Sequence, residues 1–367
     1  MHFSIQREAL LKPLQLIAGV VERRQTLPVL SNLLLTVNDQ ILSIAGTDLE
    51  VELVGRIRLE EPANAGQVTV SAHKLMDICK SLPSDALLDI NLQGQNIILK
   101  AGRSRFSLAT LPAKDFPIAE DSSTTFAFNV SQATLKQLIE RCAFAMAKQD
   151  VRYYLNGMLL ELEGNQLRAV ATDGHRLALS TVATDLLDTS RLQVIIPRKG
   201  VLELSKLLAE EQGEVQIQLG QHQARATLGN FTFSTKLVDG KFPDYQRVLP
   251  QPGQRLLVAD CRQLQDSFAR ISILCNEKFR GIRLQTNDQT LKVQANNPEH
   301  ESAEEEIEVE FRGEPLDIGF NVGYLLDVLQ VIHSEKVRIA LADGNNSALI
   351  QNEDDDSSSY VVMPMRL

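Results

Sequence analysis

The 367-residue sequence has no run of about 18 consecutive apolar residues, the length that a membrane-spanning helix needs. The segment from Met1 to Lys12 also lacks the basic-then-apolar layout of a secretion signal. We therefore expect a cytoplasmic protein. Apolar residues make up 44% of the chain and charged residues 23%, which is typical of globular proteins, and the length favours two or three domains.

Motifs for catalysis and metal binding are absent as well. The sequence has no Walker A, GxGxxG, HExxH or GxSxG motif, and its six histidines do not cluster at ligand spacing. The four cysteines lie far apart and none forms a CxxC pair: Cys79, Cys142, Cys261 and Cys275. Each lies in an apolar-periodic segment, which favours buried reduced thiols over a metal or redox site. We expect no cofactor and no metal.

A repeated pattern with a period near 125 residues organises the chain. In the segments 42–48, 167–173 and 291–297, a Leu precedes an Asp or Asn by six positions, and their starts are 125 and 124 residues apart. Apolar spacings of 3, 4 and 7 predict two helices in each copy, over 7–24, 73–80, 131–148, 198–206, 262–278 and 322–333. Because the period exceeds that of solenoid repeats, we expect three α+β domains: 1–124, 125–252 and 253–367.

Charge differs between the predicted helices and the rest of the chain. The net charge is −10, but the predicted helices carry 15 Lys or Arg against 8 Asp or Glu, so they sum to +7 and the remainder to −17. Basic helices facing phosphate would explain this, and so would Lys and Arg acting as good helix formers on solvated faces. Twelve such helices from two chains, at about 10 Å each, would enclose a hole of roughly 28 Å, which admits a DNA duplex. The acidic and Ser-rich run 353–359 is interpreted as a solvated hairpin loop.

One triplet, Asp173-Gly174-His175, has a catalytic character, because an acid near a His can orient an imidazole. A β-turn explains the same residues, since the matching turn Thr47-Asp48 in the first repeat lacks the His. A hydrolase is therefore the alternative from the enzyme class, and a scaffold that holds no DNA is the alternative from the structural class. We favour neither and expect no catalytic residues.

Four stretches carry a resemblance to a known family: 149–157, 171–178, 234–245 and 360–367. Together they resemble the bacterial sliding clamps, the beta subunits of DNA polymerase III, over essentially the whole chain. The resemblance implies three clamp domains with antiparallel sheets, and a head-to-tail homodimer that closes into a six-domain ring around duplex DNA. It also implies a processivity factor with no chemical activity of its own.

The resemblance also implies DNA-contacting residues. These are Arg24, His73, Gln149, Tyr153, Tyr154 and Lys199. Arg attracts phosphate and the tyrosines can contact backbone or stack on a base. The family commonly has Arg where His73 stands. An alternative for the Tyr pair is that one ring packs in the core.

A subunit interface follows from the same resemblance. Its apolar residues are Phe106 and Leu108 of the first domain, facing Ile273 and Leu274 of the third. Its charged residues are Lys74, Arg103 and Arg105, facing Glu299, Glu301, Glu304 and Glu305. A basic edge and an acidic edge at opposite ends of the chain suit a heterologous contact that closes a ring. Ser302 replaces the acidic residue that is usual in the family.

Finally, the resemblance implies a cleft that binds short partner peptides. Its residues are Leu155, Thr172, Gly174, His175, Arg176, Leu177, Pro243, Arg247, Val248, Asn321, Tyr324, Ser347, Val361, Val362, Met363, Pro364, Met365 and Arg366. Asn345 departs from the apolar residue often found at its position. The implied partners are the clamp loader, replicative and translesion polymerases, and mismatch-repair and replication-initiation regulatory proteins. We expect a peptide side chain to insert between Leu177, Pro243, Val248 and Met363.

Overall fold

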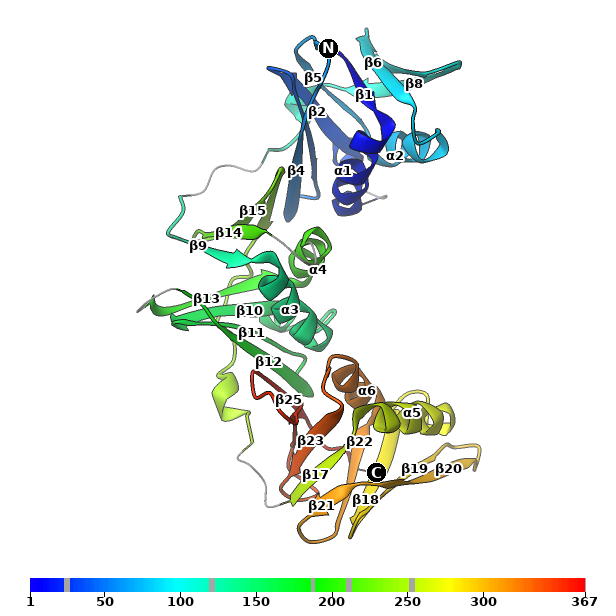
Figure 1. Cartoon of the computed structure of the whole chain (residues 1–367), viewed down its shortest axis with the longest axis vertical. Helices are drawn as coiled ribbons and strands as arrows, with labels where there is room; N and C mark the ends of the chain where they lie inside the picture. The colour runs from blue at the N-terminus through cyan, green and yellow to red at the C-terminus, as the bar shows by residue number, and fades with distance from the viewer. Residues whose placement is uncertain (23–26, 119–122, 186–188, 209–212, 251–254, 367) are drawn as a thin grey trace. The chain divides into compact units, whose positions relative to one another are not determined.

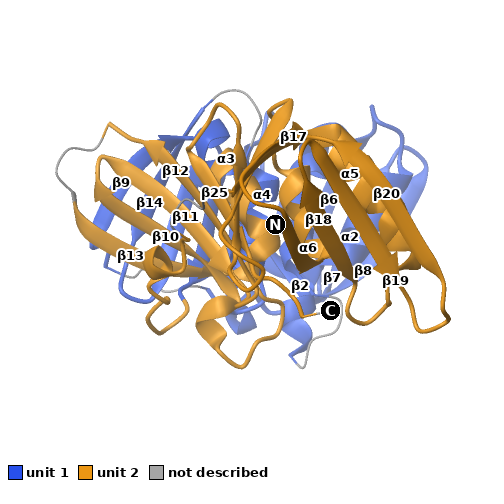
Figure 2. Ribbon diagram, turned by 90° about the horizontal axis from the view of Figure 1, so that it is seen from below, with its two compact units in different colours: residues 1–136, 199–237 blue, residues 137–198, 238–367 orange. Residues whose placement is uncertain are grey.

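The computed structural model describes the chain except residues 23–26, 119–122, 186–188, 209–212, 251–254 and 367. Figure 1 labels the helices and strands of the described chain, which forms the two compact units coloured in Figure 2. Unit 1 contains Met1–Lys136 and Lys199–Leu237, and unit 2 contains Gln137–Arg198 and Val238–Leu367. Both units combine α-helices with antiparallel sheets, so the fold is α+β as expected.

The three repeats share one order of elements, except that the third has an additional short strand, β21. The first contains β1 (His2–Gln6), α1 (Arg7–Val20), β2 (Asn32–Asn38), β3 (Ile41–Thr47), β4 (Val51–Arg58), β5 (Gly66–Ser71), α2 (Ala72–Ser81), β6 (Leu87–Gln93), β7 (Asn96–Ala101) and β8 (Ser104–Leu111). The second contains β9 (Phe126–Ser131), α3 (Gln132–Cys142), β10 (Gly157–Gly164), β11 (Gln166–Thr172), β12 (Arg176–Ala183), β13 (Thr189–Pro197), α4 (Arg198–Leu207), β14 (Glu214–Leu219), β15 (Gln223–Leu228) and β16 (Phe231–Lys236). The third contains β17 (Arg255–Asp260), α5 (Cys261–Ile271), β18 (Gly281–Asn287), β19 (Thr290–Asn296), β20 (Ser302–Glu308), β21 (Glu310–Arg312), β22 (Leu316–Asn321), α6 (Val322–Gln330), β23 (Lys336–Leu341), β24 (Ala348–Asn352) and β25 (Ser358–Val362).

All six predicted helices are present, and several are shorter than the apolar periodicity suggested. The segment 131–148 ends as an α-helix at Cys142 and continues as the 3-10 turn η3 (Ala143–Ala145), and 262–278 ends at Ile271 before η6 (Ser272–Leu274). Within their observed bounds the helices still carry 11 Lys or Arg against 6 Asp or Glu. The excess of positive charge on helices is therefore a property of the fold.

The described strands form three sheets, and two of these sheets join neighbouring repeats. Unit 1 has one twelve-stranded sheet, in the order β1-β6-β7-β8-β5-β2-β3-β4-β16-β15-β14-β9. Unit 2 has a nine-stranded sheet, in the order β13-β10-β11-β12-β25-β24-β23-β17-β21, and a four-stranded sheet, β20-β19-β18-β22. The first repeat meets the second where β4 pairs with β16, and the second meets the third where β12 pairs with β25. The predicted middle domain is thus divided between the two units.

The four cysteines are buried and unpaired, as the sequence predicted. Burial raises the pKa of the Cys79 thiol to about 11 and raises that of Cys142 further, because a thiolate is poorly solvated in an apolar core. In the part of the chain that the structure describes, no helix is both long enough and apolar enough to span a bilayer.

The hairpin loop predicted at 353–359 is present, with Asp354 and Asp356 exposed and Ser358 buried. Asp355 is half-buried and lies 3.7 Å from Arg141 of α3, while Asp356 pairs with Arg338 of β23. The hydroxyl of Ser357 donates to Asp355 over 2.7 Å. The hairpin between β24 and β25 is therefore held by ion pairs to neighbouring elements of unit 2.

Candidate functional site

The turn between β11 and β12 is built by short side chains that bond its own backbone. Asp173 accepts from the amides of His175 (2.9 Å) and Arg176 (3.0 Å), and Thr172 accepts from the amide of Gly174 (3.1 Å). Gly174 has a φ of +88°, a left-handed conformation that an L side chain would strain. These contacts hold His175 outward at the end of the strand pair.

Arg176 is the most connected polar residue beside this turn. Its guanidinium donates to Asp173 (3.0 Å), to Asp327 of α6 (2.5 Å) and to the carbonyl oxygen of Phe144 (2.8 Å). The same group lies 4.6 Å from the ring centroid of Tyr324, at cation–π distance. Because Arg176 is so fully satisfied, it fixes the turn against α6 and presents little free charge to a ligand.

The N-terminal end of α6 forms the neighbouring surface. The side chain of Asn321 caps the helix by accepting from the amides of Gly323 (2.8 Å) and Tyr324 (3.3 Å). The Tyr324 ring stacks on that of His175, with centroids 6.3 Å apart and planes 20° apart. Asn321 also donates to the carbonyl oxygen of Phe279, whose side chain is 56% exposed. Phe279 was not among the predicted site residues, because one aromatic residue in a loop carries no periodic signal.

The C-terminal segment lies along this surface. The amide of Met363 donates to the carbonyl oxygen of His175 (2.9 Å), and that of Met365 donates to Gly319 of β22 (2.7 Å). The Met363 side chain is 46% exposed, whereas Val361 and Val362 are buried in β25. A soft, flexible thioether is therefore displayed next to the His175–Tyr324 pair.

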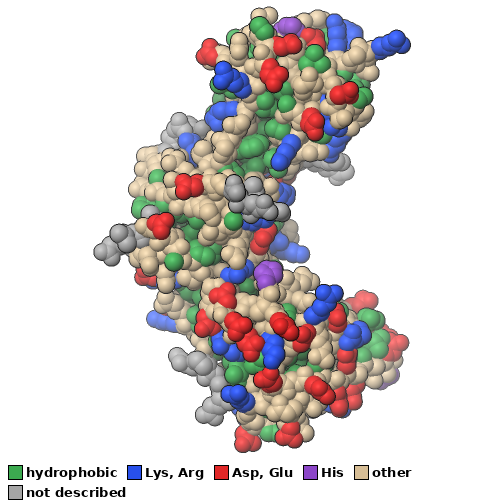
Figure 3. Space-filling view, in the orientation of Figure 1, with side chains coloured by type: hydrophobic (Ala, Val, Ile, Leu, Met, Phe, Trp, Pro, Cys, Tyr) green, Lys and Arg blue, Asp and Glu red, His purple; other side chains and the backbone are tan. Residues whose placement is uncertain are grey.

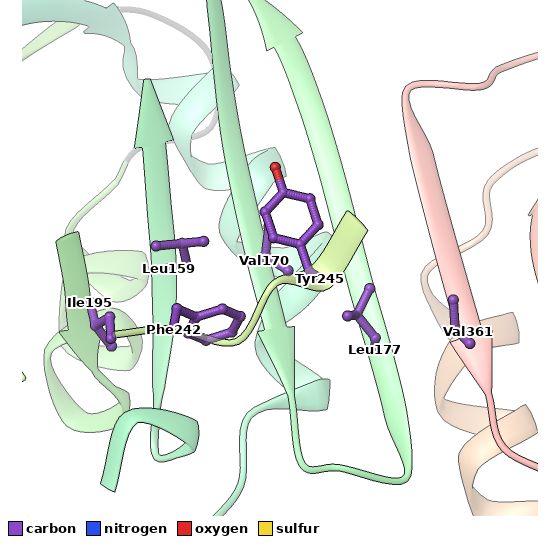
Figure 4. Packing of buried hydrophobic residues seen from close by; sticks show 7 residues of the cluster. All are labelled: Leu159, Val170, Leu177, Ile195, Phe242, Tyr245 and Val361. Atoms are coloured by element: carbon purple, nitrogen blue, oxygen red, sulfur yellow. The ribbon is translucent and has the colours of Figure 1, made fainter. Parts of the chain in front are cut away.

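A further wall comes from residues 238–249, which we call the strap. Figure 4 shows it crossing the strands, with Phe242 and Tyr245 pointing into a cluster that includes Leu177 and Val361. Phe242 and Tyr245 are 5% and 3% exposed. The strap residues that face solvent are Asp239, Gly240, Lys241, Pro243, Asp244, Gln246, Arg247 and Val248.

The structure places all the predicted cleft residues in unit 2. The exposed ones are Gly174, His175, Pro243, Arg247, Val248, Met363 and Arg366. The half-buried ones are Arg176, Asn321, Tyr324, Ser347, Pro364 and Met365. The buried ones are Leu155, Thr172, Leu177, Val361 and Val362. Of the four residues expected around an inserted peptide side chain, Pro243, Val248 and Met363 are exposed, whereas Leu177 is 2% exposed because it packs with Phe242 and Tyr245 of the strap.

The predicted DNA-contacting residues have different surroundings. Arg24 lies outside the described residues. Lys199 is held by Glu22 (2.8 Å) and by Asp48, so its charge is already paired within unit 1. Both ring nitrogens of His73 are shielded from solvent and lack a hydrogen-bond partner among the described residues.

The loop 149–156 of unit 2 is more open. Gln149 is exposed and Tyr153 is 75% exposed, whereas Tyr154 packs partly against the cluster under the strap. The loop is braced by Asn156, which bonds the backbone of Asp150 in both directions at 2.8 Å. Hydrogen bonds from Arg152 lower the pKa of Asp150 to about 2, so this carboxylate stays ionised. Tyr153 is therefore exposed on a turn that is held by hydrogen bonds. Tyr154 is the ring of the pair that packs towards the core.

The predicted interface residues lie on two strand edges. In β8, residues 104–109 pair with β7, and β5 reaches β8 at Thr110 and Leu111, which leaves the 104–109 edge unpaired within the described chain. Phe106 and Leu108 share one face of this strand, and Lys74, Arg103 and Arg105 are exposed.

The second edge is β20, the terminal strand of the four-stranded sheet. Acidic side chains gather over this part of unit 2 (Figure 3), and Glu299, Glu301 and Glu304 are exposed. Glu304 already pairs with Lys292 (2.7 Å) and Glu305 with Arg270 (2.5 Å), so these two carboxylates have partners on their own chain. Ile273 in η6 is 77% exposed and Leu274 is half-buried.

The hydrolase alternative finds no support in the geometry. The carboxylate of Asp173 is taken up by the turn and by Arg176, and the imidazole of His175 stacks on Tyr324. An acid–base pair needs the carboxylate to bond the ring nitrogen. The β-turn interpretation therefore accounts for the triplet.

Comparisons with known proteins agree over the whole chain. Family models described as the N-terminal, central and C-terminal domains of the DNA polymerase III beta subunit match residues 1–120, 129–244 and 246–366. A beta sliding clamp of Pseudomonas aeruginosa is 63% identical over 367 residues, with both chains fully covered. Two similar crystal structures, both of sliding clamps bound to griselimycin and both fully covered, come from P. aeruginosa (TM-score 0.98, 63% identity) and Bartonella birtlesii (TM-score 0.96, 36% identity).

Proposed function

The chain belongs to the DNA polymerase III beta subunit family, the bacterial sliding clamps, and we propose how its surfaces perform that role. It is a non-catalytic processivity factor that holds the replicative polymerase on DNA. The three repeats are its three clamp domains, and we propose their boundaries at 124/125 and 252/253. We also propose the cytoplasm as its location, which a fluorescent fusion would test by its overlap with the nucleoid.

Two chains close head to tail into a ring. The observation that carries this is the pair of open strand edges, basic along β8 and acidic along β20. An unpaired edge can bond another strand, and opposite charges select the heterologous contact, which closes when the rotation returns to the start. Ile273 and Leu274 supply apolar area facing Phe106 and Leu108 of the partner subunit.

Duplex DNA passes through the ring without base-specific contacts. The net positive charge of the helices, in a chain of net charge −10, supports contacts to phosphate on the inner surface. We assign the DNA contacts mainly to Arg24, Gln149 and Tyr153, because Lys199 is paired with acidic residues and the ring nitrogens of His73 are shielded from solvent. A loose ring that binds through phosphates slides, since no register on the DNA is favoured.

Partner proteins bind at the surface between the strap, the β11–β12 turn, α6 and the C-terminal segment. Short peptides from the clamp loader, the polymerases and the repair and initiation-regulatory proteins place an apolar side chain against Pro243, Val248 and Met363. The exposed Phe279 extends this surface beside Asn321. Binding is of moderate affinity, because a disordered peptide must be ordered on docking.

Primer extension by the replicative polymerase tests the proposal. With the clamp loader, wild-type protein should give long products from a primed single-stranded circle. A chain that lacks residues 363–367 should stay dimeric and stay on circular DNA, yet give short products. Full stimulation by this truncated chain would contradict the proposed cleft.

A further inference from the structure

The strap is joined to the nine-stranded sheet of unit 2 by a polar contact that lies beside an apolar cluster. The hydroxyl of Tyr245 donates to Oε1 of Glu161 over 2.5 Å. Glu161 lies on β10, its side chain is fully buried, and its strand neighbours on the same face include Leu159 of the cluster. An ionised carboxylate is costly in such a place, so its presence needs a reason beyond packing.

Glu161 is held in its ionised form by groups from several strands. Arg168 of β11 donates to Oε1 at 2.9 Å, while Arg191 and Gln193 of β13 donate to Oε2 at 2.9 and 2.5 Å. Burial raises the pKa of Glu161, but the hydrogen bonds from Tyr245, Arg168, Arg191 and Gln193 outweigh it and leave that pKa below its usual value. The sheet therefore presents a fixed acceptor to the strap.

The backbone hydrogen bonds of the strap join it both to this sheet and to itself. At its start, the amide of Val238 donates to Ile195 of β13 (2.9 Å). The described amides of Arg247, Val248 and Leu249 bond back to the strap itself, to Asp244 and Tyr245. Packing of Phe242 and Tyr245 is nondirectional, whereas the Tyr245–Glu161 hydrogen bond fixes distance and direction.

We propose that Tyr245 and Glu161 form a latch that positions the strap for peptide binding. The latch sets where Pro243, Arg247 and Val248 stand relative to Met363, and it keeps Tyr245 over Leu177. Tyr245 and Glu161 are positioning residues: they act through the exposed strap residues and need not touch the peptide. The role of the latch in peptide binding rests on the proposed peptide cleft. Its effect on the position of the strap can be tested without the cleft.

The test uses full-length dimeric protein and Tyr245→Phe, which removes one hydroxyl and keeps the ring. Griselimycin, which is bound to two similar clamps in their crystal structures, serves as the binding probe in titration calorimetry. Hydrogen exchange of the strap amides should become about tenfold faster in Tyr245→Phe. The apparent Kd for griselimycin should rise in the same variant, by no more than this factor of about ten, because it varies inversely with the population of the correctly placed strap.

Glu163→Gln is the matched control. Glu163 is on the same strand and bonds the same Arg168 (2.8 Å), and the described contacts do not join it to Tyr245. Glu163→Gln should leave the hydrogen exchange of the strap amides and the Kd for griselimycin unchanged. In a Glu161→Gln background, Tyr245→Phe should add less than it does alone, because the two residues act as one unit.

Three outcomes would overturn the latch. One is unchanged strap exchange in Tyr245→Phe. Another is faster exchange with an unchanged Kd, which would leave Tyr245 a purely structural role. The third is fully additive effects of the two substitutions. Loss of the peptide cleft itself is a separate result: if removal of residues 363–367 left the griselimycin Kd unchanged, the cleft would fail while strap exchange would still decide the latch.

Discussion

Replacing Ile273 with Ala should open the ring without unfolding the chain. The side chain is 77% exposed in the single chain, so almost all of its burial would come from the partner subunit. The change removes three carbons, and at about 0.8 kcal/mol for each buried carbon the loss is about 2 kcal/mol at each interface. Dissociation of a head-to-tail dimer breaks two identical interfaces, so the dimer should weaken by about 4 kcal/mol, or roughly a thousandfold.

Sedimentation velocity over a dilution series measures this weakening, and thermal unfolding shows whether the chain remains folded. Val151→Ala is the control, because Val151 is 88% exposed but belongs to the loop 149–156 and to neither of the two strand edges. The control should leave the dimer intact. If Ile273→Ala dissociated at the same concentration as wild type, or only together with a fall in unfolding temperature, Ile273 would not be an interface residue.

Three other predictions concern the DNA, the cleft and the thiols. Arg24→Ala should weaken DNA binding in fluorescence anisotropy and reduce the slope of log Kd against log salt by about 0.9. Lys199→Gln should change this slope less, because Lys199 is already paired with Glu22. Equal slopes for wild type and Arg24→Ala would show that Arg24 does not contact DNA. Met363→Ala should raise the griselimycin Kd about tenfold. Leu87→Ala changes an equally exposed side chain (46%) in unit 1 and should leave this Kd unchanged. Equal Kd values for wild type and Met363→Ala would exclude Met363 from the cleft. The four thiols should resist iodoacetamide at pH 8 in the folded protein and react in denaturant, because burial raises their pKa; fast labelling of the folded chain would contradict that burial.

The sequence predicted the repeats and helices well because both depend on local patterns. Apolar spacing along one helix face survives whatever the helix packs against, so all six helices appear where periodicity put them. Helix ends were less predictable: the tight turns after Cys142 and Ile271 keep apolar residues at similar spacing, and only backbone geometry separates them from an α-helix.

Long-range pairing could not be predicted from the residues in isolation. Glu161 lies between two leucines in a strand, which locally indicates a solvated side chain, and its partners Arg191 and Tyr245 are 30 and 84 positions away. Lys199 is similarly paired with Glu22, 177 positions away, so its candidacy as a phosphate contact looked stronger from sequence than from structure. Burial of Leu177 depends on the strap, which has no strand or long-helix pattern to indicate where it docks.

Retention on DNA of different topology is the most direct test of the ring. Protein loaded onto a nicked circle should remain bound through gel filtration and should be released when a restriction enzyme linearises the same DNA. Release is expected because a closed ring can slide off the ends of linear DNA but cannot leave a circle. Its phosphate contacts are weak at physiological salt and do not hold it in place. Equal retention on circular and linear DNA would contradict encirclement and with it the account of this chain as a sliding clamp.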